Sequence, residues 1–175
     1  MSSIEADHPI RILTRVTIIT NDVLSTEALT DLRQNYDLIA LRTNNMQVFK
    51  QACQSYDIDI ISLYPNERLE FELEQHDIEL AMSRHVYFEL CYSPSIRDNQ
   101  ARTMTLQLAK QLIEYTKGQK LIISSEAEIV SELRLPGDIF YFAKALGLPN
   151  DKAKFTTEKN GEQLLYYINK RKQLQ

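Results

Sequence analysis

Five short apolar runs, separated by stretches with helical periodicity, limit most strongly what this 175-residue chain can fold into. The runs are rich in Ile, Val, Leu and aromatic residues, as is typical of strands that are buried on both faces. They occupy residues 15–20, 37–42, 58–63, 86–92 and 120–124. Strands of this kind belong to parallel sheets whose faces are covered by helices. The sequence therefore predicts an α/β protein with a parallel sheet.

The intervening stretches predict helices. Their predicted ranges are 24–34, 44–54, 96–117, a helix from 125 that ends at Pro136, 139–146 and 163–171. The longest, 96–117, carries an apolar stripe at helical spacing, and the spacing of Ser95 and Asp98 resembles a capping box. Gly118 is expected to end this helix.

Two architectures fit this alternation of strands and helices: an open doubly wound sheet, or part of a (β/α) barrel. Five strands complete an open sheet but are too few for a closed barrel of eight. No linker or low-complexity stretch divides the chain. We therefore expect a single domain.

The charge of the chain is unevenly distributed. Its net charge of −4 argues mildly against nucleic acid as a partner. However, residues 1–80 contain 14 acidic and 6 basic residues, whereas residues 81–175 contain 10 acidic and 14 basic residues. The segment 67–79 is strongly acidic, and either a solvated helix face and its flank or a basic protein neighbour would suit it. The basic second half keeps a local nucleic-acid surface possible.

The two cysteines fit a reduced intracellular compartment better than a disulfide framework. The first residues lack the features of a secretory signal, and the apolar runs are too short to span a bilayer, so no membrane partner is expected.

Several catalytic signatures are absent from the sequence. The four glycines form neither a dinucleotide-binding motif nor a P-loop, and no nucleophile elbow is present. The three histidines form no metal-binding pair, and His85 precedes a predicted strand, where ligands are rarely bound. Asp57 and Asp59 are expected to be a solvated strand entrance or a structural cap. No catalytic residue, metal site or cofactor is therefore predicted.

Polar residues follow the predicted strands at their carboxyl ends, where parallel α/β proteins place their functional sites. Amides, hydroxyls and an arginine suit hydrogen bonding to phosphates better than acid–base catalysis. Arg97 lies in the first turn of a predicted helix, where the helix dipole disfavours a cation. It either pairs with Glu89 or Asp98, or it binds a phosphate. Together with Arg84 and Arg102, it could contact a sugar–phosphate backbone.

The stretch 84–98 resembles a known family, the TIM-barrel-like 30-kilodalton protein subunit of ribonuclease P and ribonuclease MRP. The resemblance is carried by Tyr-Phe-Glu at 87–89, Cys-Tyr-Ser-Pro at 91–94 and Ile-Arg-Asp at 96–98. Further motifs at 36–42, 51–63, 67–69, 122–128 and 132–138 follow in the same order. Together they cover about residues 11–165.

This resemblance implies a non-catalytic subunit that binds and stabilises the catalytic RNA during removal of the 5′ leader of precursor tRNA, and in the MRP particle during processing of ribosomal RNA precursors. It also implies other protein partners, among them a small α/β subunit, and a location in the nucleus, within the nucleolus. On this basis we predict that RNA is contacted by five residues, namely Arg84, Tyr92, Arg97, Arg102 and Arg134.

The resemblance also predicts a PHP-like barrel that lacks the first strands of the usual family barrel, because family members begin further upstream. The expected organisation is an N-terminal extension at 1–10, one barrel-like domain at 11–172 and a tail at 173–175. Glu126 departs from the family's usual glycine. Two alternatives are a PHP-like metal-dependent phosphoesterase and a protein–protein scaffold that does not contact RNA.

Overall fold

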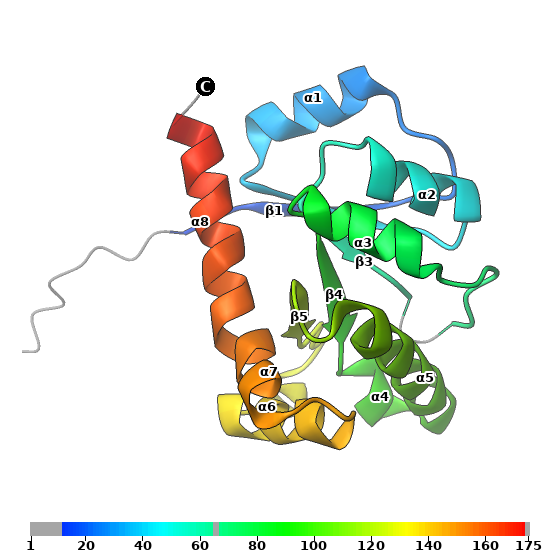
Figure 1. The fold of residues 1–175 in the computed structure, drawn as a ribbon, viewed down its shortest axis with the longest axis vertical. Helices are drawn as coiled ribbons and strands as arrows, with labels where there is room; N and C mark the ends of the chain where they lie inside the picture. Colours follow the sequence, from blue (N-terminus) through cyan, green and yellow to red (C-terminus); the bar gives the residue numbers. More distant parts are fainter. Residues whose placement is uncertain (1–11, 65–66, 174–175) are drawn as a thin grey trace, which may run out of the picture.

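The computed structural model describes residues 12–64 and 67–173, which form one parallel sheet with helices on both faces (Figure 1). The predicted extension at 1–10 and residues 174–175 of the predicted tail lie outside the described residues. The strands are β1 (Arg15–Ile19), β2 (Leu38–Arg42), β3 (Ile60–Ser62), β4 (Tyr87–Cys91) and β5 (Leu121–Ser124). The parallel α/β fold predicted from the sequence is confirmed.

The strands pair in chain order, β1-β2-β3-β4-β5, and every pair is parallel. Within the described residues β1 pairs only with β2, and β5 only with β4, so the sheet is open. The helices are α1 (Thr26–Asn35), α2 (Met46–Gln54), α3 (Gln75–Ser83), α4 (Pro94–Arg97), α5 (Asn99–Thr116), α6 (Pro136–Ala145), α7 (Asn150–Lys154) and α8 (Asn160–Gln173). A short 3₁₀ helix, η1 (Val130–Glu132), precedes α6, and a π-helical segment, η2 (Phe155–Lys159), precedes α8.

Side chains alternate between the two faces of the sheet, as strand geometry requires. One set, which includes Ile39, Ile61 and Phe88, enters the main hydrophobic core. Helices α1, α2, α3 and α5 contribute to that core and form the outer layer of the molecule (Figure 1). The alternate set, which includes Ala40, Ile60 and Tyr87, lies on the opposite face of the sheet, which we call the inner face.

Helix α8 covers part of this inner face, where Leu164 and Ile168 pack against a second apolar cluster that contains Tyr87. In Figure 1 the helix runs from the neighbourhood of β5 towards β1. Its first residue, Asn160, donates hydrogen bonds to the carbonyls of Gly118 and Leu121 at 2.9 and 2.8 Å. These contacts fix the start of α8 beside the start of β5.

Ion pairs fix the end of α8. Arg171 contacts Asp59 at 2.7 Å, and Arg33 contacts the other oxygen of the same carboxylate at 2.6 Å. Asp59 is only 3% exposed and also accepts the Ile39 N–H at 2.8 Å, so it is a buried structural cap and not a solvated strand entrance. Lys172 pairs with Asp37 next to β2.

The predicted helix over 96–117 is wrong in one respect, because it is divided at Asp98. The Asp98 side chain accepts the Ala101 N–H at 2.7 Å and caps α5. The Ser95 hydroxyl instead donates to the Tyr92 carbonyl at 2.6 Å, so the predicted capping box is not formed. The extended backbone of Asp98 separates α4 from α5.

The predicted helix that starts at 125 is also wrong. Residues 125–135 are irregular apart from η1, and Pro136 begins α6 instead of ending a helix. Proline is well suited to the first helical position because its missing N–H has no partner there. Helix α3, which is not among the predicted helix ranges, begins inside the acidic segment and overlaps it at 75–79; its Ile78 and Ala81 enter the main core.

Candidate functional site

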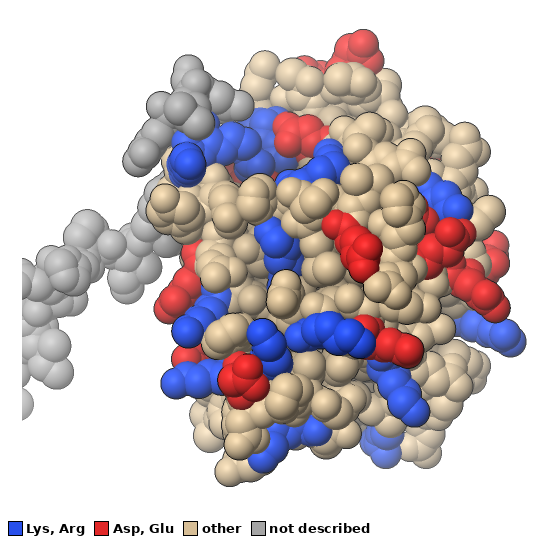
Figure 2. Space-filling view, in the orientation of Figure 1, with Lys and Arg blue, Asp and Glu red and all other residues tan. Residues whose placement is uncertain are grey.

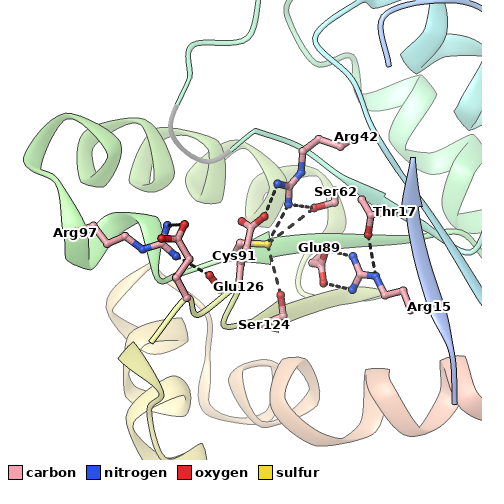
Figure 3. Close-up of polar contacts among 10 residues, drawn as sticks. Arg15, Thr17, Arg42, Ser62, Glu89, Cys91, Arg97, Ser124 and Glu126 are labelled. Atoms are coloured by element: carbon pink, nitrogen blue, oxygen red, sulfur yellow. Dashed lines mark hydrogen bonds and ion pairs between the residues drawn. The ribbon is translucent and has the colours of Figure 1, made fainter. Parts of the chain in front are cut away.

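Polar side chains stand on the inner face of the sheet, and those on β2, β3 and β5 are the last residues of their strands (Figure 3). They stand at alternate strand positions, which bring them to the same face of the sheet. The set consists of Arg15 and Thr17 on β1, Arg42 on β2, Ser62 on β3, Glu89 and Cys91 on β4, and Ser124 on β5. Most of them line a cavity of about 410 Å³ together with Glu126.

An ion pair between the partly exposed Arg15 and the buried Glu89 joins the first and fourth strands across this face. Both terminal nitrogens of Arg15 contact the carboxylate of Glu89, each at 2.6 Å. Burial raises the pKa of Glu89, but the hydrogen bonds and charge of Arg15 outweigh it, so the pKa lies below its usual value. Glu89 is therefore ionised at neutral pH and does not act as a general acid.

Arg42, which is buried, is the second cation of the inner face. Its guanidinium donates to the Ser62 hydroxyl at 2.8 Å and pairs with the carboxylate of Glu126. Cys91 lies 3.6 Å from Arg42, yet burial and neighbouring carboxylates raise its pKa to about 12. The Cys91 thiol is thus protonated and unsuited to nucleophilic chemistry.

Arg97 lies on the other side of Glu126 and ties α4 to the loop after β5 (Figure 3). Its guanidinium contacts Glu132 at 2.8 Å, Glu128 at 2.7 Å and the Glu126 carbonyl at 2.6 Å. The predicted pairing of Arg97 with Glu89 or Asp98 is therefore wrong. The hydrogen bond from Arg97 also lowers the pKa of Glu132. The carboxylates of Glu128 and Glu132 compensate the charge of Arg97. These contacts fix the loop after β5.

Tyr92 and Arg134 meet at the same end of the sheet. The buried Tyr92 hydroxyl accepts the main-chain N–H of Arg134 at 3.0 Å. The Arg134 side chain donates to the carbonyls of Ser131 and Leu133 and is exposed. Arg102 is also exposed, and its Nε donates to the Ser95 carbonyl at 2.9 Å. Neither arginine forms an ion pair with any residue in 12–64 or 67–173.

Arg84 lies at the opposite, amino-terminal end of β4. Its guanidinium donates to the carbonyls of Ala52, Cys53 and Tyr56 at 2.7–3.0 Å. The structure thus brings together four of the five predicted RNA contacts, Tyr92, Arg97, Arg102 and Arg134, and separates Arg84 from them.

Sequence reasoning missed the Arg15–Glu89 pair because it depends on which strands lie across the inner face from each other. The available signal was a charged residue inside an otherwise apolar strand, as at Glu89. Among the described residues, no group of three or more His, Cys, Asp or Glu side chains is arranged to hold a metal ion. No described helix is long and apolar enough to cross a membrane.

Comparison with known proteins gives consistent matches. The family model for RNase P subunit p30 matches residues 2–173. The chain is 33% identical over 167 residues to protein GAMETOPHYTE DEFECTIVE 1 of Arabidopsis thaliana, covering 94% of this chain and 29% of that protein. It is 34% identical over 155 residues to ribonuclease P protein subunit p30 of Mus musculus, covering 87% of this chain and 58% of the mouse protein.

A third relative, ribonuclease P/MRP protein subunit RPP1 of Saccharomyces cerevisiae, is 25% identical over 143 residues, covering 82% of this chain and 49% of the yeast protein. The chain thus spans less than two thirds of each of these three relatives.

The fold is also found in a chain of the cryo-EM structure of archaeal ribonuclease P with mature tRNA. The TM-score is 0.75 at 20% sequence identity, and the match covers 93% of this chain and 71% of that one. At this identity the likeness concerns the fold. The family model, however, spans nearly the whole sequence, and the resemblance at 84–98 agrees with it. The chain belongs to the RNase P subunit p30 family.

Proposed function

We propose that this chain acts as a protein subunit of ribonuclease P, which binds and stabilises the RNA of that particle while the RNA carries out cleavage of the tRNA leader. The observation that carries the proposal is the match of the p30 family model to residues 2–173. Protein partners within the particle follow from the same membership. The polypeptide then contributes structure and not catalytic groups.

The charge pattern supports an RNA surface at the carboxyl end of β4 and β5. Exposed arginines without carboxylate partners attract phosphates, because binding releases counterions condensed on the RNA. Arg102 and Arg134 meet this description. Arg97 and Tyr92 hold the segments that present them, and Arg97 remains 30% exposed beside them. Arg84 is left out of this surface because of its position.

More specific features of the function rest on the relatives. The yeast relative is named for both ribonuclease P and ribonuclease MRP, so we extend the proposal to the MRP particle. We also propose that the partners include a small α/β subunit. The eukaryotic relatives favour a nuclear location, and we propose the nucleolus as the place within it.

The proposed surface is tested by measuring how the chain binds RNase P RNA as salt is raised. Replacing both Arg102 and Arg134 with glutamine should weaken binding. It should also make the slope of a plot of log affinity against log salt concentration less steep, by about 0.7–0.9 for each phosphate that an arginine neutralises. Lys110→Gln on the outer layer removes one charge as a control. Equal affinities and slopes for the wild type and the double variant would refute this surface.

A further inference from the structure

A second group of cationic and aromatic side chains lies at the amino-terminal end of the sheet. We call His85, Tyr87, Lys120 and Tyr167 the basic–aromatic cluster. The rings of His85 and Tyr167 stack with their centroids 3.9 Å apart. The ammonium of Lys120 lies 2.7 Å from His85 Nδ1, and it lies 5.0 and 5.3 Å from the ring centroids of Tyr87 and Tyr167. One lysine thus contacts three aromatic rings.

The hydrogen-bond chemistry fixes the charge of this cluster. A lysine ammonium can only donate, so His85 Nδ1 accepts and the imidazole is neutral, with its proton on Nε2. Burial lowers the pKa of His85, as do the neighbouring cations Lys120 and Lys170. Burial also lowers the pKa of Lys120. The cluster therefore holds one positive charge on a half-buried ammonium.

Among the residues that the structure describes, no carboxylate balances this charge. Lys120 forms no ion pair within the part of the chain that the structure describes, and burial alone shifts its pKa. This sets it apart from Arg171 and Lys172 on the same side of the molecule, which pair with Asp59 and Asp37. Figure 2 shows many lysine and arginine side chains, with several acidic ones among them, over the lower half of the molecule, where Figure 1 places the lower part of α8. Lys120 thus offers an anion a positive charge that no described carboxylate neutralises.

The cluster is also open to ligands. His85 is exposed, and the neighbouring Tyr166 is 64% exposed and meets Tyr167 edge to face at 5.8 Å between centroids. Beneath Lys120, the hydroxyl of the fully buried Tyr87 has no hydrogen-bond partner among the described residues. Flat exposed rings next to an unpaired cation match the two groups of a nucleotide, because a base stacks on rings and a phosphate seeks the cation.

We propose that the basic–aromatic cluster and the adjacent Tyr166 bind a single-stranded segment of RNA, with Lys120 contacting a phosphate and the exposed rings of His85 and Tyr166 stacking against bases. This site rests on the proposed function, since it supplies a second contact for the same RNA. It lies at the opposite end of the sheet from Arg102 and Arg134, so the RNA contacts both ends of the domain.

The experiment uses the full chain and a fluorescent oligouridylate of about 15 nucleotides, with binding followed by fluorescence anisotropy over a range of salt concentrations. Lys120→Gly removes the charge at a position where φ is +50°, which glycine adopts readily, so the fold is retained. Tyr166→Ser removes an exposed ring without changing charge. Lys110→Gln, in α5, is the matched charge control, and circular dichroism checks that each variant is folded.

We expect Lys120→Gly to weaken binding at least about fivefold and to make the salt slope less steep by about 0.7, the value for one phosphate on a single strand. Tyr166→Ser should weaken binding about fivefold or more and leave the slope unchanged, because stacking releases no counterions. Lys110→Gln should bind as the wild type does.

Wild-type affinity in both Lys120→Gly and Tyr166→Ser would overturn this site and leave the proposed function intact. Failure of the wild-type chain to bind the oligonucleotide would also overturn the site, whereas the proposed function is decided separately by binding to RNase P RNA. A polyglutamate peptide is the competing probe. If it binds more tightly than the oligonucleotide, and this binding depends on Lys120, the cluster is a site for an acidic protein and the RNA site is overturned.

Discussion

At the scale of single residues, Arg15 and Glu89 determine the character of the inner face. They are 74 residues apart in sequence, yet their two 2.6 Å contacts join the edge strand β1 to β4 across the sheet. The Glu89 side chain is 3% exposed, so its charge is stable there only with a close cationic partner. The pair therefore couples β1 to the centre of the fold.

Replacing Arg15 with methionine should destabilise the protein by about 3 kcal/mol or more, because it leaves the buried Glu89 carboxylate without a partner. Urea unfolding at neutral pH measures this loss. Replacing both residues with apolar ones, Arg15→Met with Glu89→Leu, should restore most of the stability. A double variant as unstable as Arg15→Met alone would show that the pair has another role.

Asp37 makes stability depend on pH. The hydrogen bonds from Lys172 and Thr14 lower the pKa of Asp37 to about 2. Because the ionised form is favoured in the folded state, the stabilisation is complete above the unfolded pKa of about 4 and is lost as the pH falls through the folded pKa of about 2. Asp37→Asn should therefore be less stable than the wild type at pH 7 and nearly equal to it at pH 2. Urea unfolding at the two pH values checks this, and a difference that persists at pH 2 would contradict it.

At the scale of elements, the strands were predictable because each is a short apolar run within a regular alternation. The helix ends were harder, since Ser-x-x-Asp and Ser-x-x-Glu spacings occur both in caps and in loops. At 95–98 the true cap is the aspartate itself, and at 125–128 no helix forms. Helix α3 was given no predicted range because its first half lies within the acidic segment and its apolar face is short.

The candidate site was predictable only in part, for a related reason. The sequence motifs place Tyr92, Arg97 and Arg102 close together within residues 92–102, and Arg134 in a separate motif at 132–138. The partners of Arg97, namely Glu128 and Glu132, lie 31 and 35 residues further along the sequence. Such contacts depend on the packing of the loop after β5, which local patterns do not specify.

Asp98→Ala should destabilise the protein by about 1 kcal/mol, because it removes the side-chain cap from the Ala101 N–H at the start of α5. Thermal or urea unfolding measures the change. Asp98→Asn is the matched control, since asparagine caps helices about as well as aspartate. If both variants are equally destabilised, the charge of Asp98 matters and not its cap.

At the scale of the whole molecule, the two ends of the sheet differ in charge organisation. The carboxyl end presents Arg102 and Arg134 beside a loop that Arg97 fixes. The amino end presents Lys120 among aromatic rings, next to α8. An overall acidic chain can therefore offer two local cationic surfaces. This arrangement is compatible with the proposed role as an RNA-binding subunit.

The most direct test of RNA-subunit function is affinity purification of the tagged chain from its own cells, followed by sequencing of the RNA that remains bound. We predict strong enrichment of the RNA of ribonuclease P together with other protein subunits, and a marked decrease of that RNA when Arg102 and Arg134 are both replaced by glutamine. Recovery of protein partners without any enriched RNA would contradict a role as an RNA-binding subunit.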